Sequence, residues 1–352
     1  MAITSASNGR GTGTGNGSGN GSGATRRVTA KDVAREAGVS QATVSYVINN
    51  TAHQKISDET RERVLAAVAA LRYTPSAAAR ALRRGSSDLV LLVLPDVPLG
   101  PNIAHFMESI TDELEPHGLT AITRRTRDST PVSGLWRELR PVAVIGLSSF
   151  GEQDELEMRE AGIHVVSALL SPVSGRSMLS VPQTLVGRMQ VEHLAATGHR
   201  RIGYAAPDDA RVSEYFHLRL YGVRTACLDL GLDEPYVLPV SLDVPAGEAA
   251  VRAWRAGENP VTGVCAYNDE TAFAILSGMY SLGLAAPRDL AVIGVDNIPL
   301  AQLATPPLTT IDQNLEAVAA FMARTIVAAI AGRRPPRSRA ADVVTLVVRE
   351  SA

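Results

Sequence analysis

The chain has 352 residues, 45% of them hydrophobic and 20% charged, which predicts two or three domains with real cores. No apolar run approaches the ~20 residues that a membrane-spanning helix needs, and the N-terminus has no apolar signal segment. A membrane protein and an exported protein are therefore not expected. Two cysteines, Cys227 and Cys265, are too few for a disulfide framework or a multi-cysteine zinc site. A reducing cytoplasm is the expected compartment.

The first 25 residues are a low-complexity segment. Nineteen of them are Gly, Ser, Thr or Asn, and glycine occupies every second position from Gly9 to Gly23. Such a segment has nothing to bury, so we expect residues 1–25 to be a disordered tail. The glycines do not follow the G-x-G-x-x-G spacing and no strand precedes them, which argues against a nucleotide-binding loop.

Charge is unevenly distributed over the rest of the chain. Residues 26–86 hold eleven Lys or Arg against five Asp or Glu, a net charge of +6, whereas residues 87–352 hold twenty-two against thirty-one, a net charge of −9. A basic module before an acidic body often marks a part that binds a polyanion. On charge alone, a chance imbalance over sixty residues stays open as the alternative.

Residues 26–75 predict three short helices. Thr29 is placed to cap the first, Gly38 to end it, Ser40 to cap the second, and the third begins after Ser57. A glycine-containing turn between the first two helices is typical of a helix-turn-helix module. The residues expected to face inward are Val33, Ala34, Ala37, Val44, Val47, Ile48, Val64, Leu65, Val68 and Leu71.

The second helix leaves Gln41, Ala42, Ser45, Tyr46 and Asn49 off its apolar stripe. A helix of this size fits the major groove of DNA, where polar side chains read the edges of bases. The alternative is a three-helix bundle whose polar face only meets water. The caps, the glycine turn and the basic balance together favour DNA.

A short basic segment follows the three helices. Pro75 ends the bundle, and Ser76 opens an alanine-rich stretch with helix propensity that is too short to be stable alone. We therefore predict a hinge helix and linker over residues 76–87 that orders only when a partner supplies contacts. Leu82, set among arginines, suits an apolar wedge in the minor groove, and a plain linker between domains is the alternative.

Residues 88–352 alternate between apolar runs and helical stretches, which predicts an α/β fold with parallel sheets in two similar subdomains. The expected strands are 89–94, 142–146, 163–167, 201–205, 261–266 and 290–295, and the expected helices are 103–115, 153–160, 184–197, 218–230, 247–255 and 269–282. Ligands of such sheets bind beyond the carboxyl ends of the strands. Asp96, Asn268, Asp269 and Asp296 lie at such ends, as candidate site residues or as helix caps.

These segments, in this order, resemble the LacI/GalR family of transcriptional regulators. The resemblance covers residues 26–352. In the N-terminal part it rests on residues 28–34, 37–40, 43–45, 47–49, 57–71, 73–77 and 79–82, and further along the chain on residues 192–194, 198–202, 268–269, 292–296, 306–310 and 346–351.

The resemblance implies an all-α helix-turn-helix headpiece followed by an α/β, periplasmic-binding-protein-like effector domain of two subdomains. It also implies a homodimer on a near-palindromic double-stranded DNA operator. Gln41, Ala42 and Tyr46 would contact bases, and Thr43 and Ser45 would hold the helix against DNA. Leu82 would be the hinge leucine of the minor groove, and Arg83 and Arg84 would lie along phosphates. The DNA-binding set is completed by Thr29, Ser40, Asn49 and Ala79.

The resemblance also implies a site for a small-molecule effector. Arg219 falls at the ligand-clamping arginine, Asp296 at the carboxylate that accepts from hydroxyl groups, and Asn268 at a pocket amide. This set suits a polyhydroxylated or weakly anionic molecule. A structural ion pair between Arg219 and Asp296 is the alternative. Asn102 and Ile103 fall on the loop that forms the opposite wall of the site in the family. Two residues depart from the family pattern: Leu242 stands where some members have a sugar-stacking aromatic residue, and Pro182 where the family commonly has an acidic one.

The sequence therefore predicts a ligand-responsive DNA-binding regulator, with repression favoured, in which effector binding changes the angle between subdomains and so reaches the hinge. Whether effector binding releases the protein from its DNA operator or recruits it to the operator is left open. The competing class is a small-molecule or sugar receptor with the same body, which would not need residues 26–86. An enzyme is not expected, because no H-E-x-x-H, G-x-S-x-G or P-loop spacing occurs, and no catalytic, metal or cofactor site is predicted.

Overall fold

The computed structural model describes residues 28–48, 56–74, 87–126, 133–148, 150–169, 179–336 and 344–352. The chain divides into two compact units, residues 1–79 and 80–352. The predicted tail over residues 1–25, the predicted hinge helix, and Asn49, Ala79, Leu82 and Arg83 lie outside the described residues. Among the helices that the structure describes, none is long and apolar enough to cross a membrane.

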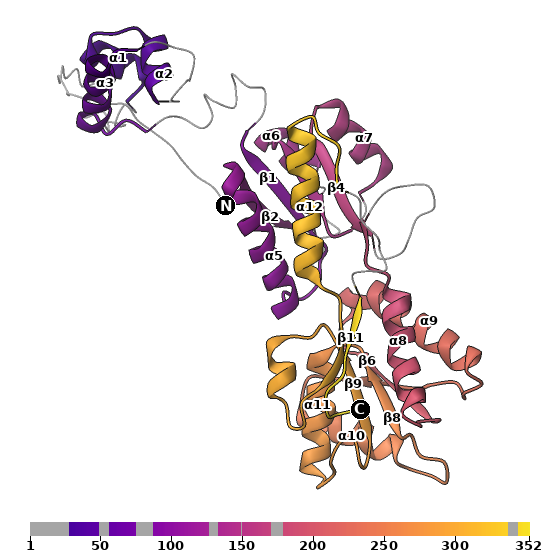
Figure 1. The fold of residues 1–352 in the computed structure, drawn as a ribbon. Coiled ribbons are helices and arrows are strands. Elements are labelled where there is room, and N and C mark those ends of the chain that lie inside the picture. Colours follow the sequence, from indigo (N-terminus) through magenta and orange to yellow (C-terminus); the bar gives the residue numbers. More distant parts are fainter. Residues whose placement is uncertain are drawn as a thin grey trace, which may run out of the picture. The chain divides into compact units, whose positions relative to one another are not determined.

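The N-terminal unit holds three helices, α1 (Ala30–Ala37), α2 (Gln41–Ile48) and α3 (Asp58–Ala70) (Figure 1). Local side chains set the ends of these helices. At the start of α1, the carboxylate of Asp32 accepts a hydrogen bond from the backbone N–H of Thr29 at 3.0 Å. Gly38 ends this helix with φ +64°, a conformation that costs a glycine little. The Oγ of Ser40 accepts from the N–H of Thr43 at 3.1 Å and so caps α2.

One small core joins the three helices. Its fully buried members are Val33, Ala34, Ala37, Val44, Val47, Val64 and Ala67. The prediction that Leu65 faces inward was wrong, because its side chain is 50% exposed. On α3 the buried positions are Val64 and Ala67, and a residue next to Val64 points about 100° away around a 3.6-residue helix.

The first sheet of the larger unit has the order β2-β1-β3-β4-β5, all parallel. Its strands are β1 (Leu89–Leu94), β2 (Thr120–Arg125), β3 (Ala143–Gly146), β4 (His164–Leu169) and β5 (Leu179–Ser180), and the helices between them are α5 (Pro101–Leu114), η1 (Glu115–His117), α6 (Ser133–Leu139) and α7 (Glu152–Glu160). Both faces of β1 are buried because alternate residues pack oppositely: Leu92 packs in one cluster with Phe106 of α5, and Leu91 in another with Trp136 of α6.

The second sheet has the order β11-β10-β9-β8-β6-β7, parallel except that β11 runs antiparallel to β10. Its strands are β6 (Ile202–Pro207), β7 (Tyr236–Val240), β8 (Gly263–Ala266), β9 (Ala291–Val295), β10 (Thr309–Asp312) and β11 (Thr345–Val347), and its helices are α8 (Gln183–Ala196), η2 (Ala210–Val212), α9 (Ser213–Asp229), α10 (Val244–Trp254), α11 (Asp269–Ser281) and η3 (Pro299–Leu303). The helices pack in pairs, α8 with α9 and α10 with α11.

The chain crosses between the two sheets more than once. Helix α12 (Leu315–Ile330) follows β10 of the second sheet, yet it packs on α5 and β4 of the first, and β11 then returns to the second sheet (Figure 1). Residues 181–183 and 313–315 are two of the connections. The predicted fold class, a helical headpiece and an α/β body with two parallel-dominated sheets, is confirmed.

Candidate functional site

The α2 helix presents a polar face to solvent. Val44 and Val47 are buried, whereas Gln41 and Ala42 are exposed. The first turn of the helix contains no acidic residue, which would repel a polyanion. Of the other predicted DNA-binding residues within the described part, Thr29 and Ser40 are exposed and Thr43, Ser45 and Tyr46 are half-buried. Their contact with DNA stays a prediction.

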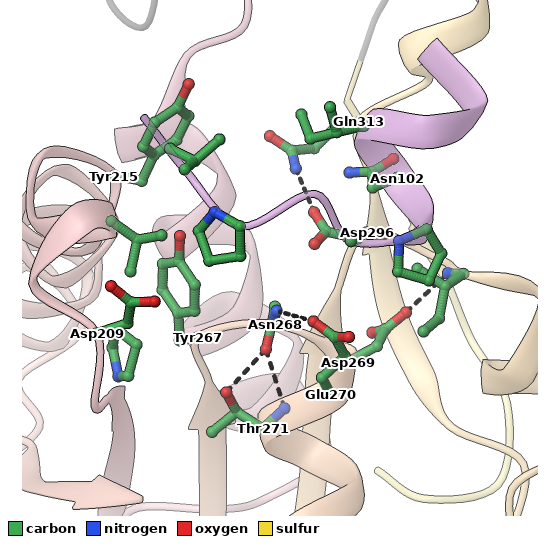
Figure 2. A pocket seen from close by; sticks show the side chains of 18 of the residues that line it. Asn102, Asp209, Tyr215, Tyr267, Asn268, Asp269, Glu270, Thr271, Asp296 and Gln313 are labelled. Atoms are coloured by element: carbon green, nitrogen blue, oxygen red, sulfur yellow. Dashed lines mark hydrogen bonds between the residues drawn. The ribbon is translucent and has the colours of Figure 1, made fainter. Parts of the chain in front are cut away.

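A cavity of about 460 Å³ lies in the larger unit, at the carboxyl ends of strands from both sheets. This is within the usual range for a small-molecule site. The segments that follow β1, β6, β8 and β9 all contribute side chains to it. All six predicted effector residues line this one cavity: Asn102, Ile103, Arg219, Leu242, Asn268 and Asp296. Figure 2 labels Asn102, Asn268 and Asp296.

Arg219 lies on α9 beneath the cavity and is only 3% exposed. Its Nε donates to Oε1 of Gln183 at 2.8 Å, and its Nη1 donates to the carbonyl of Tyr267 at 2.5 Å. Its Nη2 stands 3.8 Å from Oδ1 of Asp296, and the guanidinium also stacks 4.7 Å from the ring centroid of Tyr267. The ion pair that the sequence left as an alternative is therefore present, and each guanidinium nitrogen has a partner in the protein.

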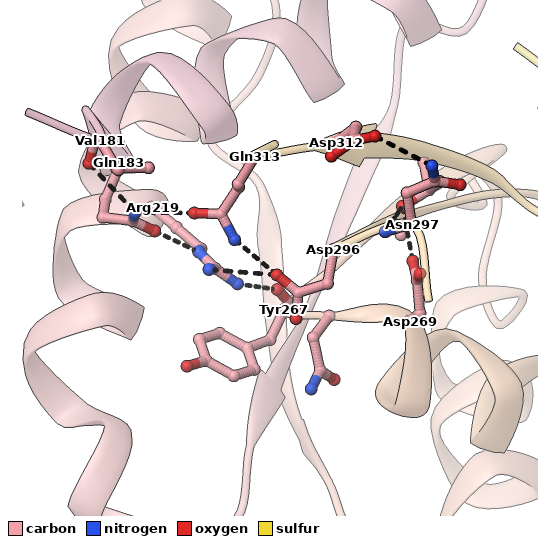
Figure 3. Close-up of polar contacts among 12 residues, drawn as sticks. Val181, Gln183, Arg219, Tyr267, Asp269, Asp296, Asn297, Asp312 and Gln313 are labelled. Atoms are coloured by element: carbon pink, nitrogen blue, oxygen red, sulfur yellow. Dashed lines mark hydrogen bonds and ion pairs between the residues drawn. The ribbon is translucent and has the colours of Figure 1, made fainter. Parts of the chain in front are cut away.

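Two glutamines connect Arg219 to Asp296 (Figure 3). Gln183 donates from Nε2 to the carbonyl of Val181 at 3.1 Å and to Oε1 of Gln313 at 2.8 Å. Gln313 in turn donates from Nε2 to Oδ1 of Asp296 at 2.5 Å. Both glutamines lie on the connections between the sheets, so this network joins the cavity to the crossing segments.

Asp296 directly follows β9 and turns toward the cavity with φ +106°, in a region that aspartate tolerates better than most residues. Burial raises the pKa of Asp296 to about 6, although Arg219 and the hydrogen bond from Gln313 oppose the rise. Asn102, from the first sheet's side, also favours the ionised form by hydrogen bonding, and Figure 2 shows it facing Asp296.

Asp269 has a structural position at the start of α11. Its carboxylate accepts from the N–H of Ile298 at 2.9 Å and from Oγ1 of Thr310 at 2.6 Å. Burial, followed by the nearby charge of Asp296, raises the pKa of Asp269 to about 7. Only 1% of the residue is exposed, and although Asp269 lines the cavity, its carboxylate is bonded to the loop after β9 and to β10.

The remaining strand-end candidates differ from each other. The Oδ1 of Asn268 caps α11 by accepting from the N–H of Thr271 at 2.9 Å, while its Nδ2 donates to Glu270 at 3.2 Å (Figure 2). Asn268 is thus both a helix cap and a cavity residue. Asp96 does not line the cavity, because its side chain pairs with Arg125 at 2.5 Å.

Sequence reasoning missed several side chains of the cavity, namely Gln183, Asp208, Tyr215, Tyr267, Glu270 and Gln313. Tyr267 could have been found, because it follows the predicted strand 261–266 and precedes Asn268. Gln313 could not, because the strand before it was not predicted. Within the described residues, no group of three or more His, Cys, Asp and Glu could hold a metal ion.

Two family models match the chain. Residues 29–76 match the model described as bacterial regulatory proteins, lacI family, and residues 191–352 match a periplasmic binding protein-like domain. The HTH-type transcriptional regulator DegA of Bacillus subtilis (strain 168) is 30% identical over 339 residues, which cover 92% of this chain and 98% of DegA.

Solved structures of transcriptional regulators also resemble the chain. The transcriptional regulator CelR in complex with cellobiose is 30% identical with a TM-score of 0.60, over 93% of this chain and 100% of CelR. A lac repressor dimer bound to its operator and the anti-inducer ONPF has a TM-score of 0.74 over 93% of this chain and 99% of the repressor. At 23% identity, this second likeness shows the fold alone.

Proposed function

The chain belongs to the LacI family of bacterial regulatory proteins, and from this membership we propose that it is a ligand-responsive, sequence-specific DNA-binding transcriptional regulator that acts by repression. The observation that carries the proposal is the pairing of two features in one chain. A helix-turn-helix unit turns the exposed Gln41 and Ala42 of α2 outward, and a separate unit encloses a cavity of small-molecule size.

The DNA target is a near-palindromic operator bound by a homodimer. A single α2 helix of eight residues can contact only a few base pairs, so a second copy related by two-fold symmetry is needed for a long, specific site. Gln41 and Tyr46 are the residues assigned to base edges, and Ala42 to an apolar contact such as a thymine methyl group. The hinge residues Ala79, Leu82 and Arg83 are assigned to the operator centre by family resemblance.

The effector acts through the cavity in the larger unit. Because residues 181–183 and 313–315 both cross between the sheets and line the cavity, a ligand there touches the connections about which the two subdomains can move. An effector shifts operator occupancy only if it binds one subdomain arrangement more tightly than the other.

Two other functional classes, a receptor and an enzyme, have less support than a DNA-binding regulator. A transport or sensory receptor could use the same body, but it would have no use for a unit matching the family's DNA-binding model. DegA and CelR are transcriptional regulators by name, and we propose that this chain likewise has no catalytic activity of its own.

The test of the proposal is selection of bound sequences from a random duplex pool by the full-length protein. We expect a symmetric consensus, bound with an affinity that falls steeply with salt because phosphate contacts release counterions. Gln41→Ala is expected to relax the preference at one base pair of each half-site and to cost about 1–3 kcal/mol of discrimination there.

The matched control is Gln153→Ala on α7, the same substitution at an exposed position of the other unit. It should leave the consensus and the affinity unchanged. Weak binding that is insensitive to salt, or selection of no symmetric sequence with and without added metabolites, would reject the DNA-binding function.

A further inference from the structure

The two walls of the effector cavity have different chemistry. On the first sheet's side the lining side chains include Val97, Leu99, Ile103, Leu147 and Ala168. Among the described residues of this wall, the one side chain with a hydrogen-bonding group is Asn102. Away from Asn102, a hydroxyl group placed against these side chains would lose its water and gain no side-chain partner. We call this the apolar wall.

The wall on the second sheet's side is rich in acceptors. It presents the carboxylates of Asp208, Glu270 and Asp296 and the rings of Tyr215 and Tyr267. Asp209 also lies here, but Arg211 donates hydrogen bonds to both of its oxygens, from Nε to Oδ1 and from Nη2 to Oδ2. We call this the acidic wall. Its carboxylates have room for donors: from the described residues, Asp208 accepts one hydrogen bond, from Ser241, and Glu270 accepts one, from Asn268.

Arg219, the cation of this wall, is only 3% exposed. Its Nε and Nη1 donate to Gln183 and to the carbonyl of Tyr267, and its Nη2 lies 3.8 Å from Oδ1 of Asp296, so its charge is shared within the protein. A carboxylate or phosphate entering the cavity would therefore meet three carboxylates and a guanidinium whose charge is already shared. The carboxylates of the acidic wall would repel an anion, most of all the buried Asp296, because water screens charges less in a protein interior than at its surface.

We propose that the effector is a neutral or cationic amphiphile, with hydroxyl or amine donors at one end for the acidic wall and an apolar body for the other wall. This inference rests on the proposed function, since it concerns the same cavity. It predicts that free sugars, whose hydroxyls surround the whole ring, and anionic metabolites are poor ligands. The tyrosine rings of the acidic wall also favour a cationic head through their π faces.

The experiment is a fragment screen of the full-length protein by ligand-observed NMR. The library holds equal numbers of cationic, neutral and anionic aromatic fragments, together with free mono- and disaccharides that include cellobiose. Pocket hits are those that weaken in Leu147→Gln, which places an amide in the apolar wall, or in the smaller change Ala168→Ser. The control Ala249→Ser, at an exposed position of α10, should leave every hit unchanged.

We expect neutral and cationic fragments to supply nearly all pocket hits. Asp296→Asn keeps a side chain that tolerates the positive φ while removing the charge, so cationic hits should weaken about tenfold and neutral hits by no more than about threefold. The inference would be overturned if anionic fragments or free sugars made up at least as large a fraction of the pocket hits as they do of the library. A screen with no pocket hits would also overturn it.

Duplex selection on the same protein preparation separates this inference from the function on which it rests. A protein that selects a symmetric duplex but binds anions or free sugars remains a regulator with an effector of another class. A protein that selects no duplex, whatever the screen finds, loses the proposed function instead.

Discussion

Gln183 is 1% exposed, and both its amide nitrogen and its amide oxygen are engaged by the protein. Gln183→Ala would leave the Nε of Arg219 and the Oε1 of Gln313 buried without partners. Each such group costs about 1–3 kcal/mol, so we expect the free energy of unfolding to fall by about 2–6 kcal/mol. Urea unfolding of the full-length protein measures it. Gln153→Ala, at an exposed position, should change it by less than about 0.5 kcal/mol, and equal losses in both variants would show that the glutamine network contributes nothing.

The raised pKa of Asp269 predicts a pH dependence of stability. In the folded protein the carboxyl group of Asp269 keeps its proton up to about pH 7, whereas the ordinary pKa of an aspartate side chain is 3.8. Because the folded state binds the proton more tightly than the unfolded chain, this carboxyl lowers the free energy of unfolding as the pH rises from about 4 to about 7. Asp296, with a pKa raised to about 6, contributes in the same direction.

Asp269→Asn removes this titration, and the Oγ1 of Thr310 can turn to accept from the new amide. We expect the stability difference, wild type minus variant, to fall between pH 4 and pH 7 and to be constant above about pH 8. Urea unfolding at a series of pH values provides the measurement. A difference that does not vary with pH would mean that the carboxyl titrates normally in the folded protein.

At the scale of the elements, glycines let two pairs of helices approach closely. A Cβ on Gly187 of α8 would overlap the carbonyl oxygen of Arg219 on α9, and a Cβ on Gly222 of α9 would overlap that of Thr184 on α8. Gly247 of α10 and Gly278 of α11 meet in the same way. Since the α8–α9 contact also positions the backbone of Arg219, helix packing and cavity geometry depend on the same glycines.

Gly187→Ala should therefore push α8 and α9 apart and destabilise the larger unit by about 1–3 kcal/mol or more. The matched control is Gly134→Ala, because Gly134 lies in helix α6 with nothing within 4 Å of the added carbon. That change should be neutral or stabilise by up to about 1 kcal/mol. Thermal unfolding of the two variants decides the matter; similar effects would mean that the α8–α9 contact tolerates an extra carbon.

The sequence predicted elements that carry a strong local pattern. The buried run of β1 was found with its full bounds, and the six expected strands all occur within two residues of their predicted ends. Edge strands such as β2, which keeps polar residues like Thr123 exposed, have no such run. Helix α12 was not assigned, although Val318, Met322 and Ile326 repeat at helical spacing and are buried. The packing of α12 on the first sheet depends on contacts between residues far apart in the sequence, which no local pattern predicts.

The residues of the site likewise divide into those that a local pattern or the family resemblance predicted and those that only tertiary packing brings together. Asn268 and Asp296 were found because each follows an apolar strand, and Asn102 and Arg219 because they match family positions. Gln183 and Gln313 are 130 residues apart, and only the crossing of the chain between sheets brings them within 2.8 Å. The distinct chemistry of the two walls is likewise a property of tertiary structure.

At the scale of the whole molecule, the two units have cores of very different size. Among its described residues, the core of the N-terminal unit buries seven side chains, all Val or Ala, whereas the larger unit contains several clusters with side chains such as Trp254 and Phe106. Small cores bury a smaller share of their surface and are less stable. Calorimetry of the full-length protein should therefore show two transitions, the first from the N-terminal unit.

A pair of matched substitutions assigns the transitions. Val44→Ala in the N-terminal core should lower the first midpoint by about 10 °C, because about 2 kcal/mol of packing is lost from a small domain, and leave the second unchanged. Val264→Ala, equally buried in β8, should lower only the second. Adding a selected operator duplex should raise the first midpoint most, since a ligand stabilises the state that binds it. A single transition that moves alike with both substitutions would show that the two units unfold as one.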